Sequence, residues 1–116
     1  MDIFFKEENN FGILSFDNGM ILYDMVGVLK EHFEKLIDNI NENINIIIDF
    51  NKISFIDSSG LGFLVNICKK IREKGNSIIL TGLQESVNDI FRLTGVSPYF
   101  TILQSIKEAK DFFNKE

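Results

Sequence analysis

Short apolar runs dominate the first twenty positions and favour β-strands. The runs at 3–7 and 11–16 are separated by the polar residues Glu8-Asn9-Asn10, which suit a hairpin turn. A further short extended piece is expected over 20–22. The pattern therefore predicts that the chain begins with a hairpin and a short strand.

From about Asp24 the hydrophobic period changes to that of amphipathic helices. The first helical stripe runs over Val26, Leu29, Phe33, Leu36, Ile37 and Ile40, and Asn-Glu-Asn at 41–43 ends it. A second stripe consists of Leu61, Leu64, Val65, Cys68 and Ile71. Gly75 closes that helix at a position suited to a left-handed cap. A third helix is expected over 86–94, and Ser105-x-x-Glu108 is a capping box that opens a fourth.

Three further apolar runs lie between these helical segments. The run at 44–50 has three consecutive isoleucines, a composition typical of a strand buried on both faces in a parallel sheet. The run at 77–81 is similar, and 99–103 suits a short edge strand. We therefore predict an α/β fold over 1–116, with a mixed, mostly parallel central sheet of four to five strands and about four helices, in three layers at most. A length of 116 residues suits one domain.

Composition narrows the classes of function. The formal net charge is −5 and no Lys/Arg run is present, which argues against nucleic-acid binding, and Lys69, Lys70 and Arg72 are interpreted as solvated surface. A single cysteine cannot form an intrachain disulfide. The amino terminus lacks the pattern of a signal peptide, and the apolar runs are shorter than the ~20 residues that span a bilayer. We expect a cytoplasmic protein without membrane insertion.

The segment that carries chemistry lies at 48–50 and 56–64, from the end of a buried strand into the start of a helix. Unpaired N–H groups at a helix start favour an added phosphate. The Ser58 hydroxyl is expected to cap this helix, and its phosphorylation would add about −1.5 to −2 charges beside Asp57. The alternative is a plain N-cap, with Gly60 and Gly62 present only for close packing. The third glycine of a dinucleotide-binding fingerprint is lacking.

The run DFNKISFIDSSGLGFLV at 49–65 strongly resembles the signature of STAS domains, the fold shared by anti-sigma-factor antagonists and the cytoplasmic ends of sulfate transporters. The segments before and after this run, and the length of the chain, also resemble those of a free-standing bacterial antagonist. It implies that Ser58 is phosphorylated by a partner that is both serine kinase and anti-sigma factor, and that the unphosphorylated form binds this partner and frees the sigma factor. A metal-dependent serine/threonine phosphatase would restore that form. ATP and magnesium would belong to the kinase, so no cofactor is expected here. Asp57 would shape the site and Ser59 would support the cap.

One segment departs from the family pattern. The family often has Gly-x-Leu-Asp before the first helix, with the Asp near the phosphorylated serine. In the run 19–24 of this chain, Leu22 occupies the expected acidic position and Asp24 comes two residues late. Either Asp24 substitutes from a shifted turn, or the contacts with the kinase differ.

The outer side of the second helix is the predicted docking surface for a partner. Phe63 and Lys70 are expected opposite the apolar stripe, with Asn66 nearby, so Phe63 is a candidate docking residue one turn from Ser58. The alternative is that Phe63 is a lone surface residue or lies under another helix.

Two other functions remain open. The same fold serves in stressosome-type scaffolds and lipid-transport complexes, whereas an antagonist should be a monomer or weak homo-oligomer. A small hydrolase using Ser58 or Ser59 would need a general base, but the only histidine, His32, is predicted in mid-helix and no Gly-x-Ser-x-Gly motif is present. We therefore expect no enzyme and no metal site. Cys68 is interpreted as a buried hydrophobe, and Asp49 as the end of a strand.

Overall fold

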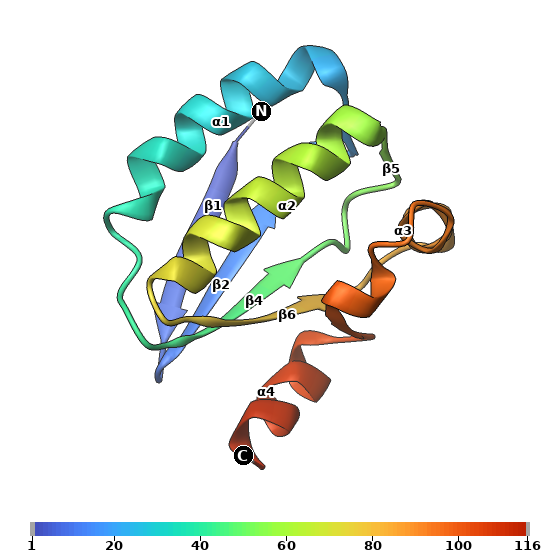
Figure 1. Ribbon diagram of the computed structural model, residues 1–116. Coiled ribbons are helices and arrows are strands. Elements are labelled where there is room, and N and C mark those ends of the chain that lie inside the picture. Colours follow the sequence, from blue (N-terminus) through green and yellow to red (C-terminus); the bar gives the residue numbers. More distant parts are fainter. Residues whose placement is uncertain (1, 116) are drawn as a thin grey trace.

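The computed structural model describes residues 2–115 and has the predicted α/β fold (Figure 1). The five-stranded central sheet has the order β1-β2-β4-β6-β7, and only the β1–β2 pair is antiparallel. These strands are β1 (Ile3–Glu8), β2 (Phe11–Phe16), β4 (Asn45–Asp49), β6 (Ser77–Thr81) and β7 (Thr101–Leu103). The mixed, mostly parallel sheet predicted from the sequence is therefore confirmed.

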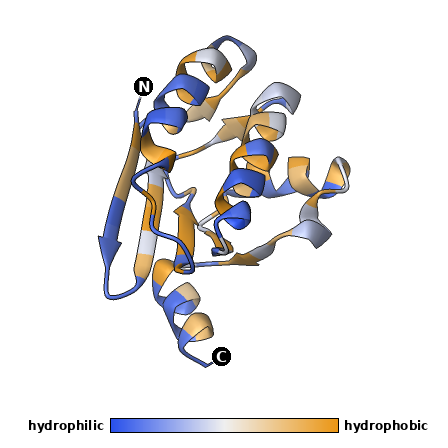
Figure 2. Cartoon of the chain, turned by 60° about the vertical axis from the view of Figure 1, so that its left-hand side comes forward, coloured by the Kyte–Doolittle hydropathy of each residue, from blue (hydrophilic) through white to orange (hydrophobic). Residues whose placement is uncertain are grey.

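Helices cover both faces of this sheet. In residues 2–115 the α-helices are α1 (Tyr23–Ile37), α2 (Ser58–Glu73), α3 (Glu85–Leu93) and α4 (Ile106–Asn114). The first three share the larger core with Ile46 and Ile48 of β4, whereas Ile47 lies in a smaller cluster with α4 on the opposite face. Figure 2 shows that the central strands are largely hydrophobic while the helices alternate hydrophobic and polar residues. Three layers result, with the sheet in the middle.

A second, two-stranded sheet lies beside the first turns of α1 and α2. Its strands are β3 (Met20–Ile21) and β5 (Phe55–Ile56), which pair in parallel with Met20 opposite Phe55. The extended piece predicted at 20–22 corresponds to β3, whereas β5 was not predicted because two residues are too few to show a period. This small sheet places the start of α1 next to the start of α2.

Local signals in the sequence account for most of the element boundaries. Asn9 and Asn10 have φ values of 48° and 72° and form the two-residue turn between β1 and β2. Gly75 has φ +82° after α2, as expected for its cap. The Ser105 side chain accepts the Glu108 N–H at 3.1 Å and caps α4. The edge strand differs from the prediction, because 97–99 form a 3₁₀ turn containing proline, and β7 begins only at Thr101.

The orientation of α2 corrects two predictions. Phe63 is only 4% exposed and belongs to the larger core, so the expectation that it projects outward for docking is wrong. Val65, expected in the core, is 43% exposed. At about 100° per residue, Phe63 lies about 40° from Ile67, a buried residue that the predicted stripe omitted. The buried arc of α2 is wider than that stripe because both the sheet and α1 pack against the helix.

We expect Phe63→Ala to lower the free energy of unfolding by about 3 kcal/mol, because it leaves a cavity in the larger core. Val65→Ala is the matched control on the same helix and should change that free energy by about 0.5 kcal/mol or less. Urea unfolding followed by circular dichroism measures both values. Equal, small effects of the two substitutions would contradict the burial of Phe63.

Candidate functional site

The Asp57 carboxylate joins the starts of two helices. Asp57 is the N-cap of α2, and its Oδ1 accepts the Gly60 N–H at 2.8 Å. Its Oδ2 accepts the Tyr23 N–H, the first of α1, at 2.9 Å. The N-cap residue of α1 is Leu22, whose side chain makes no capping hydrogen bond. A single side chain therefore caps both helices.

These hydrogen bonds stabilise the charged form of Asp57. The Gly60 N–H is the largest cause that lowers the pKa of this carboxyl below its ordinary value of 3.8, and the Tyr23 N–H is the second. Both donors belong to helix starts, where the backbone dipoles also favour a negative charge. The site thus holds one fixed anion at neutral pH.

Ser58 is the first residue of α2 and its side chain is exposed. The prediction that the Ser58 hydroxyl caps the helix is wrong, because the Asp57 side chain does so. The capping position falls to the residue with extended backbone, and Asp57 has φ −94° and ψ −178°. The Ser58 hydroxyl makes no hydrogen bond to any other described residue, whereas Ser59 is half-buried. Ser58 therefore presents its hydroxyl to solvent beside the Asp57 carboxylate.

The two glycines of this segment differ in their surroundings. A Cβ on Gly60 would lie 2.1 Å from the Ile21 carbonyl oxygen, so only glycine allows α2 to approach β3 this closely. A Cβ on Gly62 would have no heavy atom within 4 Å. Close packing thus explains Gly60 but not Gly62.

Exposed apolar side chains surround the start of α2. Tyr23 is 77% exposed, and Met20 and Phe55 on the paired strands β3 and β5 are also exposed. Nothing in the hydrophobic period marked these three residues, because they lie in short elements or at a helix start. We call Met20, Tyr23 and Phe55 the apolar rim of the site. Asp24 is exposed in the first turn of α1 at the same end.

Other chemistry-bearing groups lie elsewhere. Asn66 is exposed one turn farther along α2 than Gly62. His32 Nδ1 accepts the Ile3 N–H at 3.3 Å, so the only histidine is held against β1. Cys68 is buried, as expected, and burial raises the pKa of its thiol to about 12. Among residues 2–115, no cluster of three His, Cys, Asp or Glu side chains could hold a metal ion.

Asp49 ends β4, as predicted, and its Oδ1 accepts the Asn51 N–H at 2.9 Å. Over the described part of the chain, no helix has both the length and the apolar character needed to cross a bilayer.

Substituting the two glycines should have opposite effects. Gly60→Ala should lower the free energy of unfolding by about 2 kcal/mol, because the new methyl group meets backbone. Gly62→Ala should raise it by about 0.5–1 kcal/mol, because alanine favours the helical backbone and the site is open. Urea unfolding of both variants measures the difference, and two substitutions of the same sign would contradict this packing.

The charge of Asp57 should make stability depend on acid pH. Its pKa is lower in the folded chain, so the stability it contributes is fully present above the unfolded value of 3.8 and is lost as the pH falls through the folded value. Asp57→Asn removes the charge and leaves one oxygen to serve two N–H donors. The difference in unfolding free energy between wild type and Asp57→Asn should therefore shrink at acid pH. A difference that stays constant with pH would show that the charge contributes nothing.

Comparison with known proteins identifies the family. Residues 5–109 match the family model of the STAS domain. The chain is 32% identical over 74 residues to the anti-sigma-B factor antagonist of Listeria monocytogenes, an alignment that covers 64% of this chain and 63% of that protein. The alignment thus spans less than two thirds of the length of the first curated relatives.

Solved structures show the same fold. An anti-sigma-factor antagonist (STAS) domain protein from Planctomyces limnophilus has a TM-score of 0.82 at 19% identity, with 94% of this chain and 95% of that chain covered. SpoIIAA in its unphosphorylated form has a TM-score of 0.72 at 19% identity, covering 98% and 97%. The phosphorylated form of SpoIIAA from Bacillus has a TM-score of 0.64 at 18% identity, covering 96% and 98%. With residues 5–109 matched and the fold shared, this chain belongs to the STAS domain family.

Proposed function

We propose that this protein is an anti-sigma factor antagonist whose binding is switched by phosphorylation of Ser58. The observation that carries the proposal is the exposed Ser58 hydroxyl at the first turn of α2, directly beside the Asp57 carboxylate and close to an apolar rim. The names of the relatives support it, because the Listeria protein is an anti-sigma-B factor antagonist and SpoIIAA has been solved in both phosphorylation states.

The switch acts through surface charge. A phosphate on Ser58 adds about −1.5 to −2 charges next to the carboxylate of Asp57. The helix start tolerates this charge, but a partner surface matched to a neutral hydroxyl meets repulsion and must desolvate a dianion. The Met20, Tyr23 and Phe55 rim gives a partner apolar area to bury in the unphosphorylated form.

The proposed partner is an anti-sigma factor with serine kinase activity, and its capture by this protein frees a sigma factor. A metal-dependent serine/threonine phosphatase reverses the modification. ATP and magnesium belong to the kinase, and this protein takes no cofactor of its own. Asp24 and Asn66 are exposed and stay candidates for partner contact, while Phe63 does not.

We infer a binding role in place of catalysis for Ser58 and Ser59. A hydrolase would need a base beside the serine, and His32 is engaged with the Ile3 N–H on β1 instead. The protein would act in the cytoplasm as one unit over 1–116, as a monomer or weak homo-oligomer.

Affinity capture from the source organism's lysate, followed by mass spectrometry, tests the proposal. Wild type and Ser58→Ala should retain a small kinase-like ATPase, and Ser58→Asp should lose it. Ser77→Asp is the matched control. Ser77 is exposed at the start of β6, so this substitution adds the same charge away from the site. Tyr23→Ala should also weaken capture, whereas Val28→Ala, which removes an exposed side chain farther along α1, should not.

The outcome separates the antagonist from its rivals. Capture of the same proteins by wild type and Ser58→Asp would rule out control by charge at Ser58. Large assemblies or membrane transport subunits in both samples would instead favour a stressosome-type scaffold or a lipid-transport complex.

A further inference from the structure

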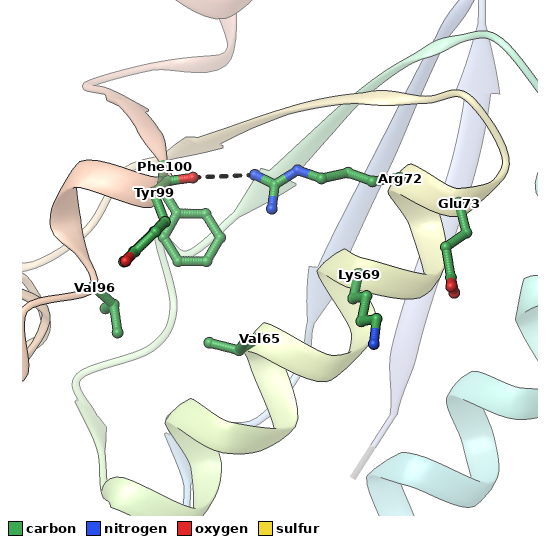
Figure 3. A pocket seen from close by; sticks show the side chains of 7 residues that line it. All are labelled: Val65, Lys69, Arg72, Glu73, Val96, Tyr99 and Phe100. Atoms are coloured by element: carbon green, nitrogen blue, oxygen red, sulfur yellow. Dashed lines mark hydrogen bonds between the residues drawn. The ribbon is translucent and has the colours of Figure 1, made fainter.

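A groove lies along the second half of α2, away from Ser58. It has a volume of about 510 Å³ and is bounded on one side by α2 and on the other by residues 96–100 (Figure 3). Val65, Val96, Tyr99 and Phe100 give it an apolar lining. Val65 is seven residues from Ser58, which is about 10 Å along the helix. This volume falls within the range of small-molecule sites.

Two cations line the groove, Lys69 and Arg72, together with one carboxylate, Glu73. Over residues 2–115, no carboxylate oxygen lies within 4.0 Å of either cation. By contrast, the neighbouring Lys70 pairs with Glu34 of α1 at 3.8 Å. The groove thus carries a surplus of positive charge in a chain whose net charge is −5.

The Arg72 side chain is held in place before any ligand arrives. Its Nη2 donates to the Tyr99 carbonyl oxygen at 3.3 Å, and its guanidinium lies 5.4 Å from the centre of the Phe100 ring. In Figure 3 the Arg72 side chain extends from α2 across to the opposite wall. A guanidinium fixed in this way keeps other N–H groups free for a carboxylate and loses little entropy on binding one.

We propose that this groove binds a small amphiphilic carboxylate, with the charged head at Lys69 and Arg72 and the apolar tail along Val65 and Val96. The charge surplus selects an anionic head, and the apolar lining selects a tail. A second copy of the chain is a poorer occupant, because each copy carries a net charge of −5 and repels the other. The site is independent of Ser58 and of the function proposed above.

Titration with decanoate, below the concentration at which it forms micelles, tests this site by ¹H–¹⁵N NMR. Saturable shifts are expected for the amides of 65–73 and 96–100, in wild type and in Ser58→Asp alike. Decanol and decyltrimethylammonium have the same tail with a neutral or cationic head, and both should bind at least about tenfold more weakly.

Variants separate the head-group contacts from the fold. Lys69→Gln removes a cation that makes no described ion pair, and Arg72→Gln removes the fixed guanidinium. Each should weaken decanoate binding, Arg72→Gln by about tenfold. Lys70→Gln, on the Glu34 side of α2, is the matched control and should leave the affinity unchanged.

Three results would overturn the proposal. The first is an absence of saturable shifts, and the second is equal binding of decanoate and decyltrimethylammonium. The third is a set of shifts at 65–73 with a cause other than decanoate. Such shifts would depend only on protein concentration, or would arise with anionic lipid vesicles and not with decanoate. These would assign the groove to a second copy of the chain or to a membrane surface.

Discussion

The hydrogen bonds of the Asp57 carboxylate hold the starts of α1 and α2 together beside Ser58. One oxygen accepts the Gly60 N–H of α2 and the other accepts the Tyr23 N–H of α1, although Tyr23 and Asp57 are 34 residues apart. The start of α1 needs this outside acceptor because Leu22 provides none. The absence of an acid at position 22 therefore does not leave the start of α1 uncapped. Gly60 completes the arrangement, since any larger residue would push α2 away from the Ile21 carbonyl.

This arrangement also determines what a phosphate on Ser58 would change. Asp57 already occupies the Gly60 N–H, so the positive potential of the α2 start is partly neutralised before any modification. Little remains for a phosphate to reorganise within the helix. Its charge would therefore act mainly on a partner that packs against Met20, Tyr23 and Phe55. A switch of this kind changes affinity through the surface and needs no movement of the core.

The sequence predicted the parts of the fold that rest on local periodicity. Continuous apolar runs made the strands at 44–50 and 77–81 recognisable, and the capping box at Ser105 placed α4. The orientation of α2 was predicted less well. The predicted stripe included Val65 and left out Ile67, so the buried face was assigned to the wrong side and Phe63 was expected to be exposed. The short strand β5 has no period to detect.

The remaining features depend on segments that are distant in the sequence. Nothing local to Asp57 shows that its second oxygen caps α1. The apolar rim likewise forms only where β3, β5 and the start of α1 meet. The groove arises because the 3₁₀ turn at 97–99 lies across from α2. The hydrophobic pattern of one segment carries no information about its tertiary contacts with distant segments.

The two surfaces of α2 can act independently even though one helix carries both. Arg72 is fourteen residues from Ser58, which is about 21 Å along the axis. That distance exceeds two Debye lengths at physiological ionic strength, where each is about 8 Å. A phosphate at one end and a carboxylate at the other would therefore hardly repel each other through solvent. Coupling would require α2 to move, and the seven buried residues along it, from Gly60 to Ile71, oppose such movement. The rigidity that presents Ser58 at a fixed place thus also keeps the groove insulated from its charge.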